Sequence, residues 1–313
     1  MRIARVHFNG KPVWGIETDG VIELVDRHFE HLSGLLQNGL NNLEKSGESV
    51  TAEKAEFLSP VTSPCNILCQ GKNYSGHRVE IGAVPQKPDF NLIFTKADSS
   101  LTGPKATIVR PSSVRLLDYE VELGLVIGKR IDIGTEITKE NWSEYVAGLV
   151  IANDISARDV QLQQGQWFKG KSYRDFCPVG PYLVPLNEYN LDQVFALRLK
   201  LYVNGQPRQD GTTADLLFKP HETLSELSQV VDLQSGDLLL TGTPGGVALQ
   251  APSSLVQRIG SFLFSESRRL AIFVKGQLKN PRYLKNGDSI TASIKSNDGL
   301  LDLGTQDLRI SAS

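Results

Sequence analysis

The sequence has 313 residues, with 33 Lys plus Arg, 35 Asp plus Glu and a formal net charge of −2. This balance leaves no excess of cations to neutralise phosphate groups, so we expect no nucleic-acid partner. An apolar fraction of 40% excludes wholesale disorder. No apolar run approaches the ~18–20 residues of a membrane helix, and three cysteines are too few for a disulfide framework. We therefore expect a cytoplasmic protein with no membrane partner.

The first sixty residues have the pattern of a small separate unit. Two alternating segments, RIARVHF and VWGIE, flank Asn9-Gly10, a dipeptide typical of a hairpin turn. A short helix is expected within residues 31–40. Because domains commonly have ~100–200 residues, the length also suggests more than one unit. We predict a small N-terminal domain over residues 1–62 and a main domain over residues 63–313.

From about residue 65 the sequence predicts many short strands and few helices. The strand candidates are CNILCQ (65–70), NLIFTK (91–96), VELGLVIGK (121–129), AGLVIANDI (147–155), GPYLVPL (180–186), FALRLKLYVNG (195–205), DLLLTGT (237–243), LAIFVKG (270–276) and SITASI (289–294). The helix candidates are SGHRVEIG (75–82), KENWSEYVAG (139–148) and TLSELSQVV (223–231). Because helices and strands do not alternate regularly, this pattern indicates a β-rich α+β fold rather than a doubly wound parallel sheet.

Acidic side chains stand at the ends of two predicted strands. Glu120 and Glu122 are two positions apart at the start of one strand, so they point to the same face. Asp154 lies at the end of the next strand. Neighbouring carboxylates resist joint ionisation unless a cation lies between them, and carboxylates without His or Cys suit Mg²⁺ or Mn²⁺. Taken alone, the Glu120–Glu122 segment fits a solvated strand face better than a metal site, and the Asp154 segment fits a helix cap or turn cluster better.

Two further segments contain candidate catalytic groups. His77 and Glu80 are three residues apart, so they share a face of the predicted helix, and such a carboxylate can orient an imidazole as a general base. Most isolated pairs of this kind are surface pairs. Residues 165–172, GQWFKGKS, match the phosphate-loop pattern G-x-x-x-x-G-K-[ST]. A polar segment precedes the match and Pro178 follows it closely, so we reject a nucleotide site and keep Lys171 as a cation near the carboxylates.

The order and spacing of six segments resemble the fumarylacetoacetate hydrolase family. These segments are GKNYSGH..E, DYEVEL, NDISARDVQ, GKSYRDFCPVGP, VNGQPRQ and GDLLLTGTPGGV. The resemblance runs from about residue 65 to 248 and resumes near residues 285–288. It implies a β-rich α+β roll of mixed sheets, a small N-terminal domain as in bacterial members, bound Mg²⁺ or Mn²⁺, and a homodimer. Against the family pattern, residues 249–284 are an atypical insertion.

By position, the resemblance assigns roles to eight residues. It implies metal binding by Glu120, Glu122 and Asp154, catalysis by His77, Glu80 and Lys171, and substrate contact by Gln161 and Thr243. The implied substrate is a small 2-oxo acid; the short N-terminal unit makes fumarylacetoacetate itself less expected.

The reaction that the resemblance implies is hydrolysis of a C–C bond in a 2,4-dioxo acid of the acylpyruvate or fumarylpyruvate type. Glu80 would orient His77 to activate water, and Lys171 and the metal would stabilise an enolate. Alternatives at the same site are decarboxylation of oxaloacetate and isomerisation of 2-hydroxyhepta-2,4-diene-1,7-dioate. A non-catalytic binder with the same fold is an alternative of another class.

Overall fold

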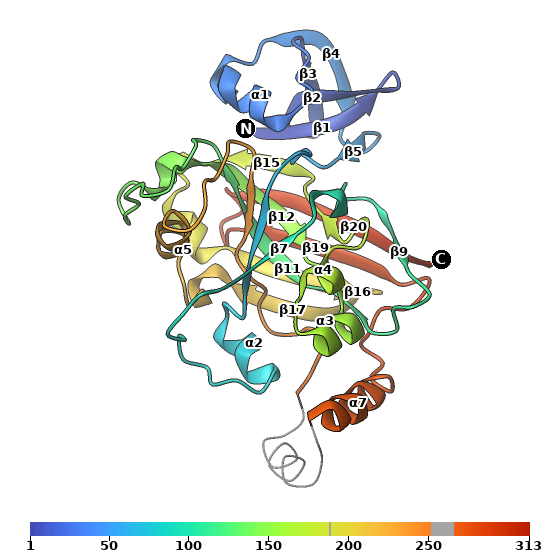
Figure 1. The fold of residues 1–313 in the computed structure, drawn as a ribbon. Coiled ribbons are helices and arrows are strands. Elements are labelled where there is room, and N and C mark those ends of the chain that lie inside the picture. Colours follow the sequence, from blue (N-terminus) through green and yellow to red (C-terminus); the bar gives the residue numbers. More distant parts are fainter. Residues whose placement is uncertain (188, 252–265) are drawn as a thin grey trace.

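The computed structural model describes residues 1–187, 189–251 and 266–313. In these ranges two large sheets dominate the fold (Figure 1). The strands of the larger sheet, in spatial order, are β4 (Lys45–Thr51), β3 (Val21–Val25), β2 (Lys11–Thr18), β1 (Arg2–Phe8), β15 (Tyr182–Pro185), β12 (Val146–Asn153), β11 (Val121–Ile127), β18 (Leu238–Leu240), β6 (Ile67–Gly71) and β7 (Leu92–Lys96), with β5 (Glu56–Leu58) paired to β1. The second sheet has the order β17 (Gln206–Thr212), β16 (Arg198–Val203), β19 (Ser289–Lys295), β20 (Asp302–Ala312) and β9 (Thr107–Arg110).

Shorter elements connect and cover the two sheets. The short strand pairs are β10 (Leu117–Asp118) with β13 (Ser156–Ala157), and β8 (Leu101–Thr102) with β14 (Cys177–Pro178). The α-helices among the described residues are α1 (Leu32–Asn38), α2 (Ser75–Glu80), α3 (Arg158–Gln164), α4 (Phe168–Lys171), α5 (Pro220–Leu227) and α7 (Glu266–Gln277). Most strand pairs are antiparallel, whereas β18 with β6, β20 with β9 and β14 with β8 are parallel. The predicted β-rich α+β fold with mixed sheets is confirmed. None of the described helices is long and apolar enough to cross a membrane.

The N-terminal unit forms the end of the larger sheet that contains β1 to β4 (Figure 1). The predicted hairpin joins β1 and β2 through Asn9 and Gly10, which have φ values of 50° and 75°. Positive φ at both positions is the geometry of the turns that match the strand twist of a hairpin. Ile3 of β1 then pairs with Leu183 of β15, so the sheet continues into the main body. The boundary at residue 62 stays a prediction.

The core lies where β11 and β12 of the larger sheet pack against β16, β19 and β20 of the second sheet. All seven residues of β11 are buried, which explains why this strand is an almost continuous apolar run. On β16 and β19 the buried residues alternate with less buried ones, as expected for a sheet with one face against the core. The polar groups described below are therefore attached to strands that are almost wholly buried.

Two predicted elements differ from the structure. Residues 139–148 contain only a short 3₁₀ turn, Trp142–Tyr145, before β12 begins at Val146. Residues 270–276, predicted as a strand, belong to α7. A short apolar run does not distinguish a strand from a helix by periodicity; here Leu270, Phe273 and Val274 are the more buried positions, at helical spacing. Helix α7 lies beside α3 (Figure 1).

Candidate active site

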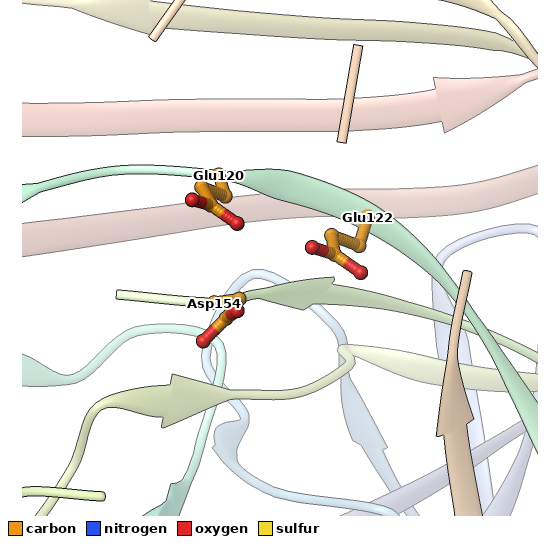
Figure 2. Close-up of side chains that lie close together, drawn as sticks. All are labelled: Glu120, Glu122 and Asp154. Carbon is orange, nitrogen blue, oxygen red and sulfur yellow. The ribbon is translucent and has the colours of Figure 1, made fainter. Parts of the chain in front are cut away.

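Three carboxylates meet where β11 begins and β12 ends. Antiparallel pairing places Val121 opposite Asn153 and thereby brings Glu120 and Glu122 next to Asp154. The amide of Asp154 donates to the carbonyl oxygen of Glu120 at 2.8 Å. All three side chains are buried, and one oxygen from each lies within 4.8 Å of the others. Figure 2 shows the three carboxylates gathered in one small region between the strands.

The chemistry of this triad fits a divalent cation. Burial, together with the charges of Asp154 and Glu120, raises the pKa of Glu122 well above its ordinary value. One oxygen of Glu122 accepts a hydrogen bond from the amide of Gly242 at 2.7 Å. A buried set of three oxygen donors that repel one another is stabilised by a hard cation such as Mg²⁺ or Mn²⁺. The triad could therefore hold such an ion.

Lys171 and Arg158 neutralise part of the triad's charge. The Lys171 ammonium lies 3.0 Å from an oxygen of Glu120 and 2.5 Å from an oxygen of Asp154. Arg158 pairs with Glu120 at 2.5 Å and with Asp118 at 2.8 Å. Burial by itself raises the pKa of Glu120, but the charges of Arg158 and Lys171 outweigh it and hold that pKa far below its ordinary value. Glu120 is thus an anion that is already well paired.

The segment that matches the phosphate-loop pattern has a different local structure. Helix α3 precedes Gly165, and α4 follows it and ends at Lys171. The strand that a phosphate loop requires before the first glycine is therefore replaced by a helix. This arrangement is what carries Lys171 to the carboxylates.

Lys96 is a member of the site that the sequence did not single out. It ends β7, its side chain is fully buried, and its ammonium donates to Asp154 at 2.6 Å. It also donates to the carbonyl oxygens of Ile155 and Lys171. Asp154 is consequently held between two lysines, one at each carboxylate oxygen. The only signal in the sequence was a lysine that closes an apolar strand segment.

A cavity of about 320 Å³ adjoins the triad, near the lower end of the ~300–1,000 Å³ typical of small-molecule sites. Its polar wall includes Gln70, Lys72, His77, Glu120, Arg158, Gln161, Lys171 and Thr243. Its apolar wall includes Ile81, Phe94, Leu162, Trp167, Leu249 and Phe273. Helix α7 and the residues before 252 therefore contribute to the cavity, so part of the atypical stretch 249–284 shapes the site. Residues 252–265 of that stretch lie outside the described residues.

His77 and Glu80 are close but do not form a hydrogen bond. Both belong to α2, and the imidazole Nδ1 lies 3.8 Å from the nearest Glu80 oxygen, beyond hydrogen-bonding distance. Both oxygens of Glu80 accept from the amide of Gly246 instead, at 2.7 and 2.9 Å. His77 is buried and lines the cavity, and its Nδ1 has no hydrogen-bond partner in the described part of the chain. The orienting role of Glu80 stays a prediction.

Gln161 and Thr243 both line the cavity and are buried. The amide oxygen of Gln161 accepts from Arg158 at 2.9 Å, which leaves its NH₂ group as a donor toward a ligand. The Thr243 hydroxyl donates to the carbonyl of Val121 at 2.9 Å and accepts from Gln209 at 2.7 Å. Thr243 therefore serves the packing of the strand as well as the cavity wall. Substrate contact by these two residues stays a prediction.

Comparison with known proteins decides the family. A family model described as fumarylacetoacetate (FAA) hydrolase C-terminal matches residues 66–310. The chain belongs to the fumarylacetoacetate hydrolase family. Among its relatives, the rat protein named oxaloacetate tautomerase Fahd2a, mitochondrial, is 36% identical over 227 residues, which are 72% of this chain and 70% of the rat protein. An uncharacterized Staphylococcus aureus protein is 41% identical over 219 residues, 68% of this chain and 70% of that protein.

Solved structures of the family share the whole architecture. A fumarylacetoacetate hydrolase from Exiguobacterium antarcticum has a TM-score of 0.78 at 30% identity, with both chains covered completely. A 5-carboxymethyl-2-hydroxymuconate delta-isomerase from Mycobacterium smegmatis has a TM-score of 0.72 at 25% identity, again over both complete chains. The family is thus one of enzymes whose named activities include hydrolysis, isomerisation and tautomerisation.

Proposed function

We propose that this protein is a divalent-metal-dependent enzyme that moves a proton to and from the carbon next to the carbonyl of a small 2-oxo acid, as in keto–enol tautomerisation. The observation that carries the proposal is the meeting of the buried triad, Lys171 and His77 at one cavity. A site of this composition favours an enolate, because its cations face the position where negative charge develops. The tautomerase activity named for the rat relative supports the same class.

Each residue has a distinct task in this proposal. Glu120, Glu122 and Asp154 would hold the cation, which supplies a Lewis acid for the enolate when it is bound. Lys171 holds Glu120 and Asp154 in place and adds positive charge. The NH₂ group of Gln161, whose amide oxygen accepts from Arg158, would donate to a substrate oxygen. His77 would accept the proton from the substrate carbon and return it to the enolate oxygen or to carbon, so that no atom is gained or lost.

Hydrolysis of a 2,4-dioxo acid is the second candidate, and the proximity of His77 and Glu80 favours it. A shift that closes the 3.8 Å gap would let Glu80 orient the imidazole. His77 would then take a proton from water, the hydroxide would attack the distal carbonyl, and the C–C bond would break to give a carboxylic acid and the enolate of pyruvate, which is then protonated. We rank hydrolysis second because both carboxylate oxygens of Glu80 accept hydrogen bonds from the amide of Gly246 instead of orienting His77.

The test compares three reactions in one preparation. Purified protein is freed of metal with a chelator and reloaded with Mg²⁺ or Mn²⁺. Enol loss from oxaloacetate is followed by ultraviolet absorbance, pyruvate formation reports decarboxylation, and acetylpyruvate consumption reports hydrolysis. We expect metal-dependent tautomerisation to be the fastest. Full activity in the chelated protein, or none with any of these substrates, would contradict the proposal.

A variant separates the two candidates. Glu80→Gln removes the carboxylate charge that water activation needs but keeps an oxygen that can accept from Gly246. Because general-base assistance contributes typically ~10²–10⁴-fold, hydrolysis that depends on the pair should fall at least about 100-fold, and tautomerisation should fall far less. Equal losses in both reactions would mean that Glu80 acts through the structure of α2 alone.

A further inference from the structure

Lys72 is a cation of the cavity wall that the proposed reaction does not use. It follows β6, precedes α2 and is half-buried. Its ammonium lies 5.9 Å from the ring centroid of Trp167, another wall residue. Arg158 and Lys171, the other cations of this wall, are both paired with carboxylates. In the described ranges Lys72 forms no ion pair with a carboxylate, unlike these two residues.

The backbone holds Lys72 in an unusual conformation. Its φ is 58°, in the left-handed region that residues other than glycine rarely occupy. Such a conformation persists only where the surroundings enforce it. Asn73 supplies that constraint: its side chain accepts from the amide of Phe218 at 2.7 Å and donates to the carbonyls of Phe218 and Thr241 at 3.0 and 2.9 Å. The turn is therefore fixed from its C-terminal side.

The residue on the other side of Lys72 is equally constrained. A Cβ on Gly71 would lie 2.8 Å from Trp167 and 2.8 Å from Leu92, closer than real contacts allow. Gly71 therefore permits the close approach of Trp167 to the turn. The chain thus has a lysine at the cavity in a backbone conformation that glycine or asparagine adopts more readily. A conformational outlier held in place by its neighbours indicates a functional role.

The environment of Lys72 favours an anionic ligand. Burial lowers its pKa, and the positive charge of Arg78 lowers it further. An ammonium that is partly removed from water and lacks a counter-ion gains most when an anion enters the same cavity. A 2-oxo acid that has its first carboxylate and carbonyl at the triad would present any second carboxylate to the remaining wall.

We propose that Lys72 binds the distal carboxylate of the substrate, so that this enzyme selects 2-oxo dicarboxylates over 2-oxo acids whose distal group is uncharged. This inference rests on the proposed function for the position of the first carboxylate. It makes Lys72 a residue of substrate specificity, separate from the metal ligands and from the proton transfer. The apolar wall around Trp167 would contact the carbon skeleton between the two carboxylates.

The test uses one change in the substrate and one in the protein. The substrates are oxaloacetate and its 4-methyl ester, which differ in the distal charge. The variants are Lys72→Asn, which removes the charge and keeps a residue type that tolerates positive φ, and Lys72→Arg, which retains the charge. The control is Lys129→Asn, because Lys129 is exposed and lies over a ring too, 4.9 Å from Tyr145, but outside the cavity.

We expect the ratio of kcat/KM for oxaloacetate to that for the ester to fall about 10- to 100-fold in Lys72→Asn, the range of a charge-assisted hydrogen bond. The change should reside mostly in KM. Lys72→Arg should retain most of the ratio, and Lys129→Asn all of it. A ratio that is unchanged in Lys72→Asn, with an unchanged melting temperature, overturns the inference.

Calorimetry keeps the two proposals distinguishable. If the wild-type protein turns over neither substrate, the proposed function fails. Oxaloacetate should still bind the metal-loaded wild-type protein at least about 10-fold more tightly than it binds Lys72→Asn if Lys72 recognises the distal carboxylate. Equal dissociation constants in the two proteins would overturn the assignment of Lys72, whatever the reaction is.

Discussion

Replacing Glu122 by Gln should stabilise the metal-free protein and weaken metal binding at the same time. Glu122 is 1% exposed, and burial and two neighbouring carboxylates disfavour its charge. In the wild type a Glu122 oxygen accepts from the amide of Gly242 at 2.7 Å, and the amide oxygen of Glu122→Gln can still do so. The new NH₂ group faces the carboxylates that repel Glu122 in the wild type. Replacing buried charges with neutral groups of similar volume is often neutral or stabilising by about 1–4 kcal/mol.

The same substitution removes one of three oxygen ligands. Substitution of a residue that supports a metal ligand typically lowers the affinity for the metal by ~10–100-fold. For the loss of a direct ligand we therefore take about 100-fold. At a Mn²⁺ concentration of about 100 times the wild-type Kd, the ion stabilises the wild type by about 2.7 kcal/mol. It would then stabilise the variant by only about 0.4 kcal/mol. The variant therefore starts more stable and gains far less from the ion.

Denaturant unfolding with and without Mn²⁺ measures both effects, and a Mn²⁺ titration followed by electron paramagnetic resonance gives the affinities directly. Two results would refute the reasoning. A metal-free variant less stable than the wild type would show that Glu122 is not under electrostatic stress. Equal stabilisation of the two proteins by Mn²⁺ would show that the triad is not the metal site.

Two further substitutions test the framework around the site. Lys96→Met should lower the free energy of unfolding by about 3–5 kcal/mol, because it breaks a buried ion pair at Asp154; Lys129→Met on the surface should stay within about 0.5 kcal/mol, and similar losses in both would contradict this account. Gly246→Ala should cost at least about 3 kcal/mol in the same assay, since its φ is 110° and a Cβ would lie 1.9 Å from the Arg208 carbonyl oxygen. Gly276→Ala, in α7 with open space around it, should instead gain about 0.5–1 kcal/mol; a gain at both glycines would refute the steric argument.

Local patterns predicted the parts of the site that depend on one segment at a time. The alternation in β11 places Glu120 and Glu122 on one face whatever the strand packs against, and Asp154 follows directly from the end of β12. The Asn9-Gly10 hairpin is equally local. Where a short apolar run allowed two periodicities, as in residues 270–276, local information was insufficient and the strand prediction was wrong.

Contacts between distant segments could not be predicted in this way. Lys96 reaches Asp154 across 58 positions, and Gly246 holds Glu80 across 166. Asp154 and Glu80 were predicted as site residues, but their partners Lys96 and Gly246 could not be identified, because each contact forms only when segments far apart in the chain pack together. No partner was predicted for Arg158 either, whereas the fold pairs it with Glu120 and Asp118.

The sequence by itself determined the family, the strand-rich fold class and the three carboxylates, because those follow from residue order and from the period of a strand. Only the tertiary structure decided how Glu120 and Asp154 are neutralised and that Glu80 is bonded to Gly246 rather than to His77. It also decided that Lys72 stands in the cavity wall without a carboxylate partner among the described residues. The physical reason is the range of the interactions: periodicity acts within a segment, whereas the burial and pairing of a charge depend on every segment that packs around it.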